Sequence, residues 1–211
     1  MARFTLHGMW PSGPTYKAGL MLALTGTPHN YVHVDLRAGE QRTNAYLAKS
    51  RFGKVPALED HEAGFSICES AVILQYLSQE TGQFGASSEI DRLRLREWQS
   101  WAITALAHGI YRVRAARLGF FQMPDAVTDA NEAEARNGLT TLDGLLQDRT
   151  WLETGAPTFA DIDLYAVVAY APQARIDLTP YRHVARWMAA VEGLPGFKGV
   201  ETLLPKESVS A

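Results

Sequence analysis

A proline inside a short apolar run constrains the fold of this chain more than any other feature. Val55-Pro56 stands within the stretch Gly53-Lys54-Val55-Pro56-Ala57-Leu58. Because proline has no N–H and cannot donate to a sheet ladder, this pair is expected at the start of a strand or on a sheet edge. There the N–H and C=O of Val55 can pair with an extended chain other than the protein's own. The bond before Pro56 is also of the kind that adopts the cis form.

A second polar feature lies downstream of Val55-Pro56. The pair Glu69-Ser70 opens a helical pattern that continues through Leu77. A helix start supplies free N–H groups and the positive end of the helix dipole, and both favour a bound carboxylate. The hydroxyl of Ser70 adds another donor. Together with Val55-Pro56, this pair indicates a receptor for an extended peptide with a carboxylate end.

The first part of the chain, residues 1–82, predicts a βαβ unit followed by a ββα unit. Alternation, Gly/Pro punctuation and β-branched content indicate each element. The expected strands are Arg3–His7, Tyr31–Asp35, Ala57–Glu59 and Phe65–Ile67, and the expected helices are a segment from about Pro14 to just before Gly26, a short piece at Asn44–Leu47, and Ser70–Gln79. The first two strands should be parallel, with a right-handed crossover.

Residues 83–87 read as a linker, and residues 88–211 as an all-helical domain. Ser88 with Asp91, and Thr158 with Asp161, have the spacing of capping boxes at helix starts. The predicted helical segments are Ile90–Val113 with Ile90, Leu93, Trp98 and Trp101 on its stripe, Asp125–Gln147 with Leu139, Leu142, Leu145 and Leu146 inward, Thr158–Ala171, and Thr179–Gly193. Residues 206–211 are expected to form a frayed tail.

Composition excludes several classes of function. The 211 residues carry a net charge of −3, with the basic residues spread along the chain, which argues against nucleic acid as a partner. Cys68 is the single cysteine, so no intrachain disulfide can form, as is typical of a reducing compartment. The start of the chain does not read as a signal peptide, and no apolar run is long enough for a membrane span. The six histidines show no metal-ligand spacing. The sequence therefore predicts a cytoplasmic protein without a metal.

Several motifs in one order resemble those of the cytosolic glutathione S-transferases. Val55-Pro56 and Glu69-Ser70 are similar to the family's Val-Pro before a strand and its Glu-Ser at the head of the third helix. The other motifs are Phe4–Gly8, Ser12–Lys17, Pro157–Leu164 and Trp187–Phe197, which resemble the first strand, the catalytic loop, the buried capping box and the closing helix. The resemblance implies a thioredoxin-like domain followed by an all-α domain, with Thr158 and Asp161 serving folding and not chemistry.

The resemblance places a thiolate-stabilising hydroxyl in the loop before the first helix. Ser12 lies five residues before Lys17, the spacing of the serine-type classes. The thiolate is the nucleophilic form of glutathione, so a donor here would activate it. A hydroxyl in a Ser-Gly-Pro loop is also typical of a turn or a helix cap, and Thr15 is a rival candidate. Tyr16 falls inside the helix pattern, which argues against a tyrosine-type mechanism.

The resemblance also implies the contacts of glutathione. Val55 would pair with the cysteinyl amide, Ser70 would bind the γ-glutamyl carboxylate, and Glu69 would bind the ammonium group. The full set of implied glutathione-binding residues is Gln41, Arg42, Lys54, Val55, Pro56, Glu69 and Ser70. For Gln41, Arg42 and Lys54, which would reach the glycyl carboxylate, a solvated surface position is an equally good interpretation.

The second substrate is expected to be a small, largely apolar electrophile. Its implied pocket residues are Met9, Trp10, His108, Tyr111 and Arg112, with Arg114 as another arginine that could polarise the electrophile. The resemblance thus indicates a homodimeric glutathione transferase that moves alkyl or aryl groups in detoxification. Two alternatives stay open: another glutathione-dependent enzyme (a peroxidase, disulfide reductase, dehalogenase or isomerase), and a non-catalytic interaction module of the same fold.

Overall fold

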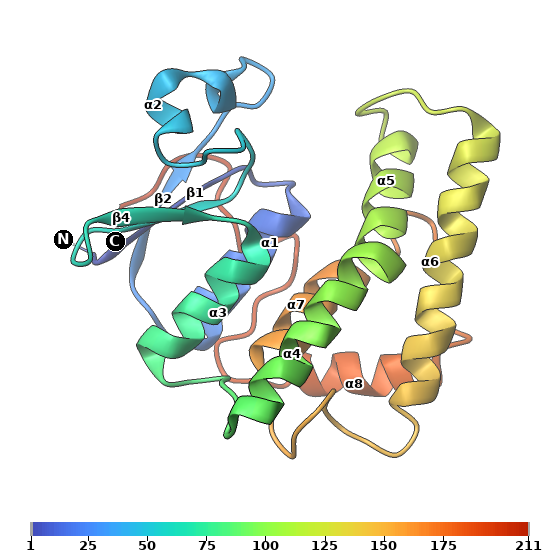
Figure 1. Cartoon of the computed structure of the whole chain (residues 1–211). Coiled ribbons are helices and arrows are strands. Elements are labelled where there is room, and N and C mark those ends of the chain that lie inside the picture. Colours follow the sequence, from blue (N-terminus) through green and yellow to red (C-terminus); the bar gives the residue numbers. More distant parts are fainter. Residues whose placement is uncertain (1, 211) are drawn as a thin grey trace. The chain divides into compact units, whose positions relative to one another are not determined.

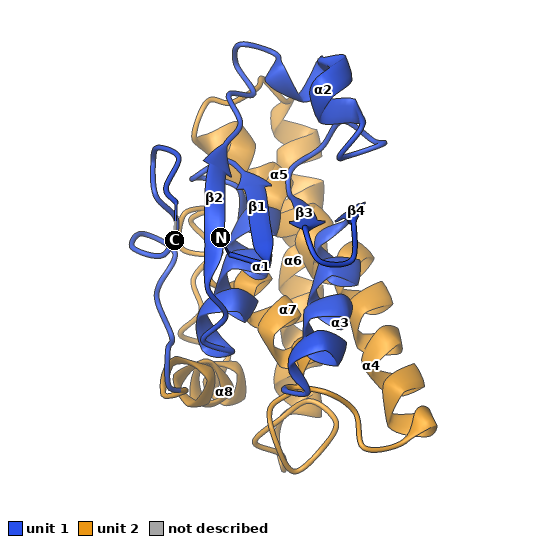
Figure 2. Ribbon diagram, turned by 90° about the vertical axis from the view of Figure 1, so that its left-hand side faces the viewer, with its two compact units in different colours: residues 1–83, 195–211 blue, residues 84–194 orange. Residues whose placement is uncertain are grey.

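The computed structural model describes residues 2–210, and its backbone divides into two compact units. Of the described residues, the first unit comprises 2–83 and 195–210, and the second comprises 84–194 (Figure 2). The sequence assigned all of residues 88–211 to the helical domain. The last segment instead packs with the first unit, because strand β2 leaves a sheet edge that this segment covers.

The first unit is built on a four-stranded mixed sheet in the order β2-β1-β3-β4. The strands are β1 (Phe4–Gly8), β2 (His29–His33), β3 (Ala57–Asp60) and β4 (Phe65–Cys68). β1 runs parallel to β2 and antiparallel to β3, and β3 forms a hairpin with β4. The predicted βαβ-ββα order is present, but β2 begins two residues before the expected Tyr31, since Phe4 pairs with His29.

Three helices accompany this sheet. They are α1 (Gly13–Leu24), α2 (Asn44–Leu47) and α3 (Ser70–Thr81), with a 3-10 turn η1 (Glu40–Arg42) before α2. α1 and α3 pack against each other, and their inner faces carry the fully buried Leu20, Ile73 and Leu77. α2 lies beyond the end of the sheet toward which the β1 and β2 arrows point (Figure 2). Gly82 ends α3 at a φ of 66°, a conformation that glycine adopts without a steric penalty.

The last residues of the chain are held against this unit and do not form the expected frayed tail. Tyr31 and Val209 exchange two main-chain hydrogen bonds of 2.8 Å, and the Ser208 hydroxyl accepts from the N–H of His33 at 2.9 Å. Closer to the start of the segment, the hydroxyl of Tyr16 in α1 donates to the carbonyl of Lys198 at 2.8 Å. The segment thus contacts both the edge strand and a sheet-packed helix.

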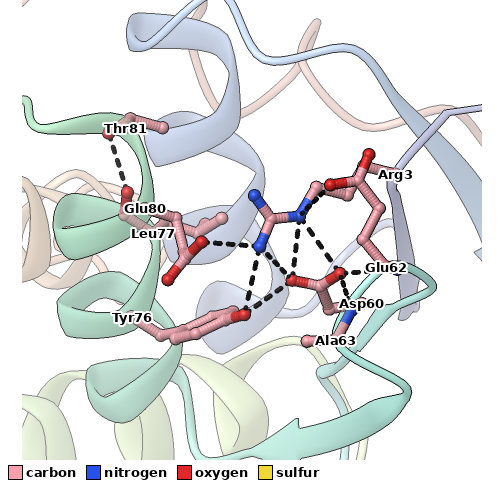
Figure 3. A network of polar contacts seen from close by, with 8 residues as sticks. All are labelled: Arg3, Asp60, Glu62, Ala63, Tyr76, Leu77, Glu80 and Thr81. Carbon is pink, nitrogen blue, oxygen red and sulfur yellow. Dashed lines mark hydrogen bonds and ion pairs between the residues drawn. The ribbon is translucent and has the colours of Figure 1, made fainter.

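A polar network joins Arg3, directly before β1, to the end of β3, the β3–β4 turn and α3 (Figure 3). The guanidinium of Arg3 donates to both carboxylate oxygens of Asp60, at 2.6–3.1 Å, and to Glu80 at 2.6 Å. The Tyr76 hydroxyl donates to Asp60 at 2.6 Å, and two N–H groups of the turn, from Glu62 and Ala63, donate to the same carboxylate. Asp60 is 1% exposed, so its charge is stabilised by these donors and not by water.

The second unit consists of helices. They are α4 (Glu89–Ala102), α5 (His108–Arg117), α6 (Asp125–Leu145), α7 (Phe159–Val168) and α8 (Arg182–Glu192), and a π-helical segment η2 (Ile103–Ala107) joins α4 to α5 (Figure 1). Ser88 caps α4 by accepting from the N–H of Asp91, as its spacing predicted. α7 ends three residues before the expected Ala171, and α8 begins after the expected Thr179-Pro180, since Thr179 is held by the carboxylate of Asp177.

Two glycines allow α6 to approach its neighbours closely. A Cβ on Gly138 would lie 2.1 Å from the carbonyl oxygen of Ala105, and one on Gly109 would lie 2.6 Å from that of Asn131. This close packing buries Leu139, Leu142 and Leu146. The expected inward position of Leu145 is wrong, because it is 45% exposed.

The exposure of residues at the start of α4 also differs from the sequence prediction. Ile90 and Leu93 are 59% and 48% exposed, although helical spacing placed them on the apolar stripe of the predicted helix. Periodicity cannot distinguish a core-facing stripe from an apolar surface that nothing within the unit covers.

The carboxylate of Asp161 organises the core of this unit. It accepts hydrogen bonds from the Thr158 N–H and hydroxyl, both at 2.8 Å, as the capping-box spacing predicted. It also accepts from the Leu152 N–H at 2.9 Å and from the indole N–H of Trp187 at 3.0 Å. Asp161 and Trp187 are fully buried, so this carboxylate ties α7 to α8 and to the preceding loop.

Candidate functional site

The sheet topology brings three chain segments to one edge. His7 pairs with Ala57, and Ala57 pairs with Cys68. The carboxyl end of β1, the amino end of β3 and the carboxyl end of β4 therefore meet. The loop that contains Ser12, the pair Val55-Pro56 and the pair Glu69-Ser70 all continue from this edge.

The Val55-Pro56 bond is cis, and its surroundings leave the backbone of Val55 available. Pro56 is buried, while Val55 is half-buried and packs against the apolar cluster of Val34, Tyr46 and Ala57. Within residues 2–210, the N–H and C=O of Val55 have no hydrogen-bond partner. Because unpaired main-chain groups are rare except where water or a ligand satisfies them, Val55 offers a strand edge to an extended peptide.

The carbonyl before Val55 is fixed by two side chains that the sequence did not reveal. The hydroxyl of Tyr46 donates to the Lys54 carbonyl at 2.9 Å, and the hydroxyl of Ser50 donates to it at 2.8 Å. Burial raises the pKa of Tyr46, so its hydroxyl stays protonated and remains a donor. These contacts bring α2 and the following turn into the site. The helical piece at Asn44–Leu47 was predictable, but the direction of its tyrosine was not.

The second pair adopts an unusual backbone. Glu69 has a φ of 75° and a ψ of 109°, which non-glycine residues seldom adopt and which costs roughly 1–3 kcal/mol. This bend starts α3 at Ser70, with the first helical hydrogen bond from Ile73 to the Glu69 carbonyl at 3.0 Å. The Glu69 side chain is exposed, and the Ser70 hydroxyl makes no hydrogen bond to the described residues. An anion near Ser70 would therefore meet a helix N-terminus with free donors.

The loop before α1 holds the two candidate hydroxyls. Ser12 is the N-cap of α1, and its oxygen accepts the N–H of Thr15 at 3.2 Å. Thr15 is fully buried, and its hydroxyl accepts the N–H of Met9 at 3.5 Å. A Cβ on Gly8 would fall 2.1 Å from the Thr15 methyl group, so the Thr15 side chain is packed against β1. Ser12 is half-buried and closer to the surface.

The three predicted contacts of a glycyl carboxylate differ in exposure. Arg42 and Lys54 have exposed side chains. Gln41 is half-buried; its amide nitrogen donates to the Leu36 carbonyl at 3.4 Å, and its oxygen is buried without a partner among the described residues. Gln41 therefore contributes to the shape of its loop, while the two cations extend into solvent.

A partly buried acid–base cluster lies on the strands next to this end of the sheet. Glu59 of β3 accepts from the ammonium of Lys49 at 2.8 Å and from His7 of β1 at 2.7 Å. Burial lowers the pKa of His7 despite the opposing effect of Glu59. Burial would raise the pKa of Glu59, but the hydrogen bonds from Lys49 and His7 outweigh it and lower this pKa. The cluster anchors the segment after α2 to the sheet, which supports the position of Ser50.

The residues predicted for the second substrate lie in both units. In the first, Met9 and Trp10 are half-buried, and the ammonium of Lys206 lies 4.9 Å from the centre of the Trp10 ring. In the second, His108 and Arg112 are exposed on α5, and the Tyr111 hydroxyl donates to the Ala166 carbonyl at 3.3 Å.

Arg114 is unsuited to polarising an electrophile. It is buried, donates to the side-chain oxygen of Gln173 at 2.6 Å, and lies 4.3 Å from the centre of the Tyr170 ring.

None of the described helices is long and apolar enough to cross a membrane. Among the same residues, no group of three or more His, Cys, Asp or Glu side chains is arranged to hold a metal ion.

Comparison with known proteins identifies the family. The profile described as "Glutathione S-transferase, N-terminal domain" matches residues 2–79, and "Glutathione S-transferase, C-terminal domain" matches residues 102–195. The disulfide-bond oxidoreductase YfcG of Escherichia coli is 25% identical over 190 residues, which cover 88% of both chains. A glutathione S-transferase from Pseudomonas fluorescens has a TM-score of 0.87 and 28% identity, with 94% of this chain and 99% of that chain covered.

A glutathione transferase from Pseudomonas putida, solved with one glutathione disulfide bound per subunit, shares the fold at a TM-score of 0.81 and 22% identity, with 92% of this chain and 89% of that chain covered. The four-stranded sheet, the helical second unit and these matches confirm the predicted combination of a thioredoxin-like domain with an all-α domain. Both family profiles and the structural match over 94% of the chain lead to one conclusion: the chain belongs to the glutathione S-transferase family.

Proposed function

We propose that this protein is a glutathione transferase, which activates glutathione as a thiolate and joins it to small, largely apolar electrophiles. The observation that carries the proposal is the unpaired main chain of Val55 at the same sheet edge as the helix start at Ser70. The first suits an extended peptide, and the second suits a carboxylate. The similarity to the glutathione S-transferase from Pseudomonas fluorescens supports the same function.

Each part of glutathione has a matching group at this edge. The cysteinyl amide would pair with the N–H and C=O of Val55 beside Pro56. The γ-glutamyl carboxylate would accept from the hydroxyl and N–H of Ser70, and its ammonium group would bind Glu69. At the other end, the exposed cations Lys54 and Arg42 would bind the glycyl carboxylate, while Gln41 shapes the loop beneath them.

Ser12 is the proposed thiolate-stabilising residue. A serine hydroxyl can accept two hydrogen bonds and donate one. Its oxygen already accepts the N–H of Thr15, which leaves the hydroxyl hydrogen free to donate to the sulfur. The thiolate would then attack an electrophilic carbon, forming the sulfur–carbon bond as the leaving group departs with its electron pair. Thr15 remains the alternative donor, but its full burial against Gly8 favours Ser12.

The electrophile is proposed to contact residues from the loop after β1 and from α5. These are Met9, Trp10, His108, Tyr111 and Arg112. Apolar and aromatic groups among them suit an apolar substrate, and Arg112 could bind a polar substituent on it.

Calorimetry with reduced glutathione tests the proposal. Wild-type protein should show saturable binding, and both Glu69→Ala and Ser70→Ala should weaken it more than tenfold, because each leaves a charged group of the ligand unmatched. Ser66→Ala, on the preceding strand β4 and outside the site, is the control and should bind like wild type. Unchanged affinity in both site variants would overturn the assignment.

A second function is favoured by one observation, the similarity to the disulfide-bond oxidoreductase YfcG. The same bound thiolate could attack a disulfide sulfur instead of carbon, releasing the second sulfur as a thiol after protonation. Turnover of an aryl halide and of a mixed disulfide, each measured with glutathione, distinguishes the two. Turnover of neither substrate by a protein that binds glutathione would support a non-catalytic interaction module.

We further propose that the protein is a cytoplasmic homodimer, consistent with a role in detoxification. Glutathione keeps thiols reduced in the cytosol, where a free cysteine such as Cys68 persists.

Ile90 and Leu93 of α4 are exposed apolar residues that a second copy of the chain could cover. Light scattering should give twice the monomer mass, and Leu93→Glu should shift the protein toward monomer. A monomeric wild type would refute this part.

A further inference from the structure

A cavity of about 340 Å³ lies within the first unit, apart from the glutathione edge. It is lined by the last turns of α1, the start of β2 and the C-terminal segment, and it is open to solvent on one side. Its wall is mainly apolar and includes Leu22, Ala23, His29, Tyr31, Lys198 and Leu203. Since β1 and β2 are parallel and Phe4 pairs with His29, the cavity begins at the opposite end of the strands from Gly8 and Ser12.

The Tyr31 hydroxyl makes this cavity more than a packing defect. Tyr31 is 3% exposed, and its hydroxyl has no hydrogen-bond partner among the described residues. A buried hydroxyl without a partner costs roughly 1–3 kcal/mol. The other tyrosine of this region, Tyr16, places its hydroxyl on the Lys198 carbonyl. The unit therefore retains, at a cost to stability, a hydrogen-bond donor that its own residues do not use.

The cavity wall carries a positive charge from Lys198. Lys198 lines it and forms no ion pair with the described residues, and no aspartate or glutamate is among the lining residues. His29 also lines the cavity, and its Nδ1 lies 3.0 Å from the Thr27 carbonyl. Because a carbonyl oxygen can only accept, Nδ1 carries the hydrogen of that bond.

We propose that this cavity is a second ligand site, which takes a small carboxylate with an apolar body. The apolar body would contact Leu22, Ala23 and Leu203, while the carboxylate would accept from the Tyr31 hydroxyl and pair with the Lys198 ammonium. The volume lies at the small end of the roughly 300–1,000 Å³ found for ligand pockets, which limits the ligand to a short chain or a single aromatic ring.

The C-terminal segment forms the movable wall of this site. It meets β2 through the Tyr31–Val209 bridge and the bond of His33 to Ser208, and most of its last residues are exposed. Few buried contacts make such a segment easy to open locally. A ligand can therefore reach the Tyr31 hydroxyl without unfolding the sheet.

Calorimetry with octanoate, compared with 1-octanol, tests the site on the full-length protein. Octanoate should bind saturably and more tightly than 1-octanol. Tyr31→Phe should weaken octanoate binding about tenfold, as expected for a hydrogen bond to a charged group. Lys198→Gln should weaken it several-fold, while Lys206→Gln, a charge change in the same segment outside the cavity, should have no effect.

Two further measurements separate this site from other causes. Without ligand, Tyr31→Phe should be as stable as wild type or more stable, because it removes an unsatisfied donor. Ala23→Leu should fill the cavity and abolish octanoate binding, and glutathione should bind Tyr31→Phe normally. Absence of octanoate binding, or equal affinity in wild type and Tyr31→Phe, would overturn the proposal whether or not glutathione binds.

Discussion

The hydroxyl oxygen of Ser12 lies 3.2 Å from the amide nitrogen of Thr15 and accepts its hydrogen bond. One atom thus caps α1 in the loop that continues from the end of the sheet where the segments of Val55 and Ser70 also begin or end. Capping and thiolate stabilisation are compatible, because the cap uses a lone pair of the oxygen and the thiolate would use its hydrogen. Ser12 can therefore cap α1 and stabilise a thiolate at the same time.

Replacing Ser12 should therefore affect both stability and rate. Ser12→Ala should raise the thiol pKa of bound glutathione and lower the rate of conjugation by about 10²-fold or more. Loss of the cap should cost about 1 kcal/mol of stability. The thiolate absorbance of the complex, titrated with pH, measures the first effect. Thr15→Val is the matched variant, and if it alone removes the thiolate signal, Thr15 is the catalytic hydroxyl.

The hydrogen bonds that hold the Lys54 carbonyl in place should increase the affinity for glutathione. Tyr46→Phe removes one of its two side-chain donors and leaves the ring in place. We expect glutathione affinity to fall several-fold while the rate at saturation changes little, since the contact positions the binding strand and does not touch the sulfur. Calorimetry gives the affinity, and steady-state kinetics give the rate. The control is Tyr165→Phe, because the Tyr165 hydroxyl contacts Glu192 in the second unit. A glutathione affinity of Tyr46→Phe equal to that of wild type would contradict the positioning role.

Loss of the Asp161 carboxylate should destabilise the helical unit. Asp161→Ala leaves four buried donors without an acceptor, and we expect the free energy of unfolding to fall by about 3 kcal/mol. Trp187→Phe removes one of these donors together with part of a buried ring. Thr158→Val removes a single hydroxyl and should cost about 1 kcal/mol. Urea denaturation measures all three, and a midpoint of Asp161→Ala equal to wild type would refute this role.

The sequence predicted the elements that periodicity and capping chemistry specify. Thr158 and Asp161 form the expected box, Gly82 ends α3, and the short helix at Asn44–Leu47 appears at its expected residues. These features depend on residues within one turn of each other. Local chemistry alone therefore determines them.

The features that the sequence missed depend on distant residues. Strand β2 was placed too late because its register is set by pairing with Phe4, and the tail was expected to fray because its partner, Tyr31, is far away in sequence. At the candidate site, the pairs Val55-Pro56 and Glu69-Ser70 were visible as motifs. The positive φ of Glu69 and the contacts of Tyr46 and Ser50 with Lys54 were not, because they follow from how the chain turns between the elements.

Because of the Arg3–Asp60 pair, the free energy of unfolding should fall as the solution becomes acidic. The hydrogen bonds from Arg3 hold the pKa of Asp60 well below its usual value in the folded protein, although burial acts in the opposite direction. The unfolded chain binds a proton to this carboxyl near its ordinary pKa of about 3.9. The contribution of Asp60 is therefore complete above that pH, and it is lost as the pH falls toward the lower, folded pKa.

Asp60→Asn tests this relationship. The variant should be less stable than wild type at pH 7, because Arg3 and the turn N–H groups lose a charged acceptor. Between pH 5 and pH 3 wild type should lose more stability than the variant, so that the difference between their urea midpoints narrows as the pH falls. Asp148→Asn, an exposed carboxylate in the second unit, should follow the wild-type profile. A difference between wild type and Asp60→Asn that stays constant across this range would show that the Asp60 charge does not contribute to the acid sensitivity of the fold.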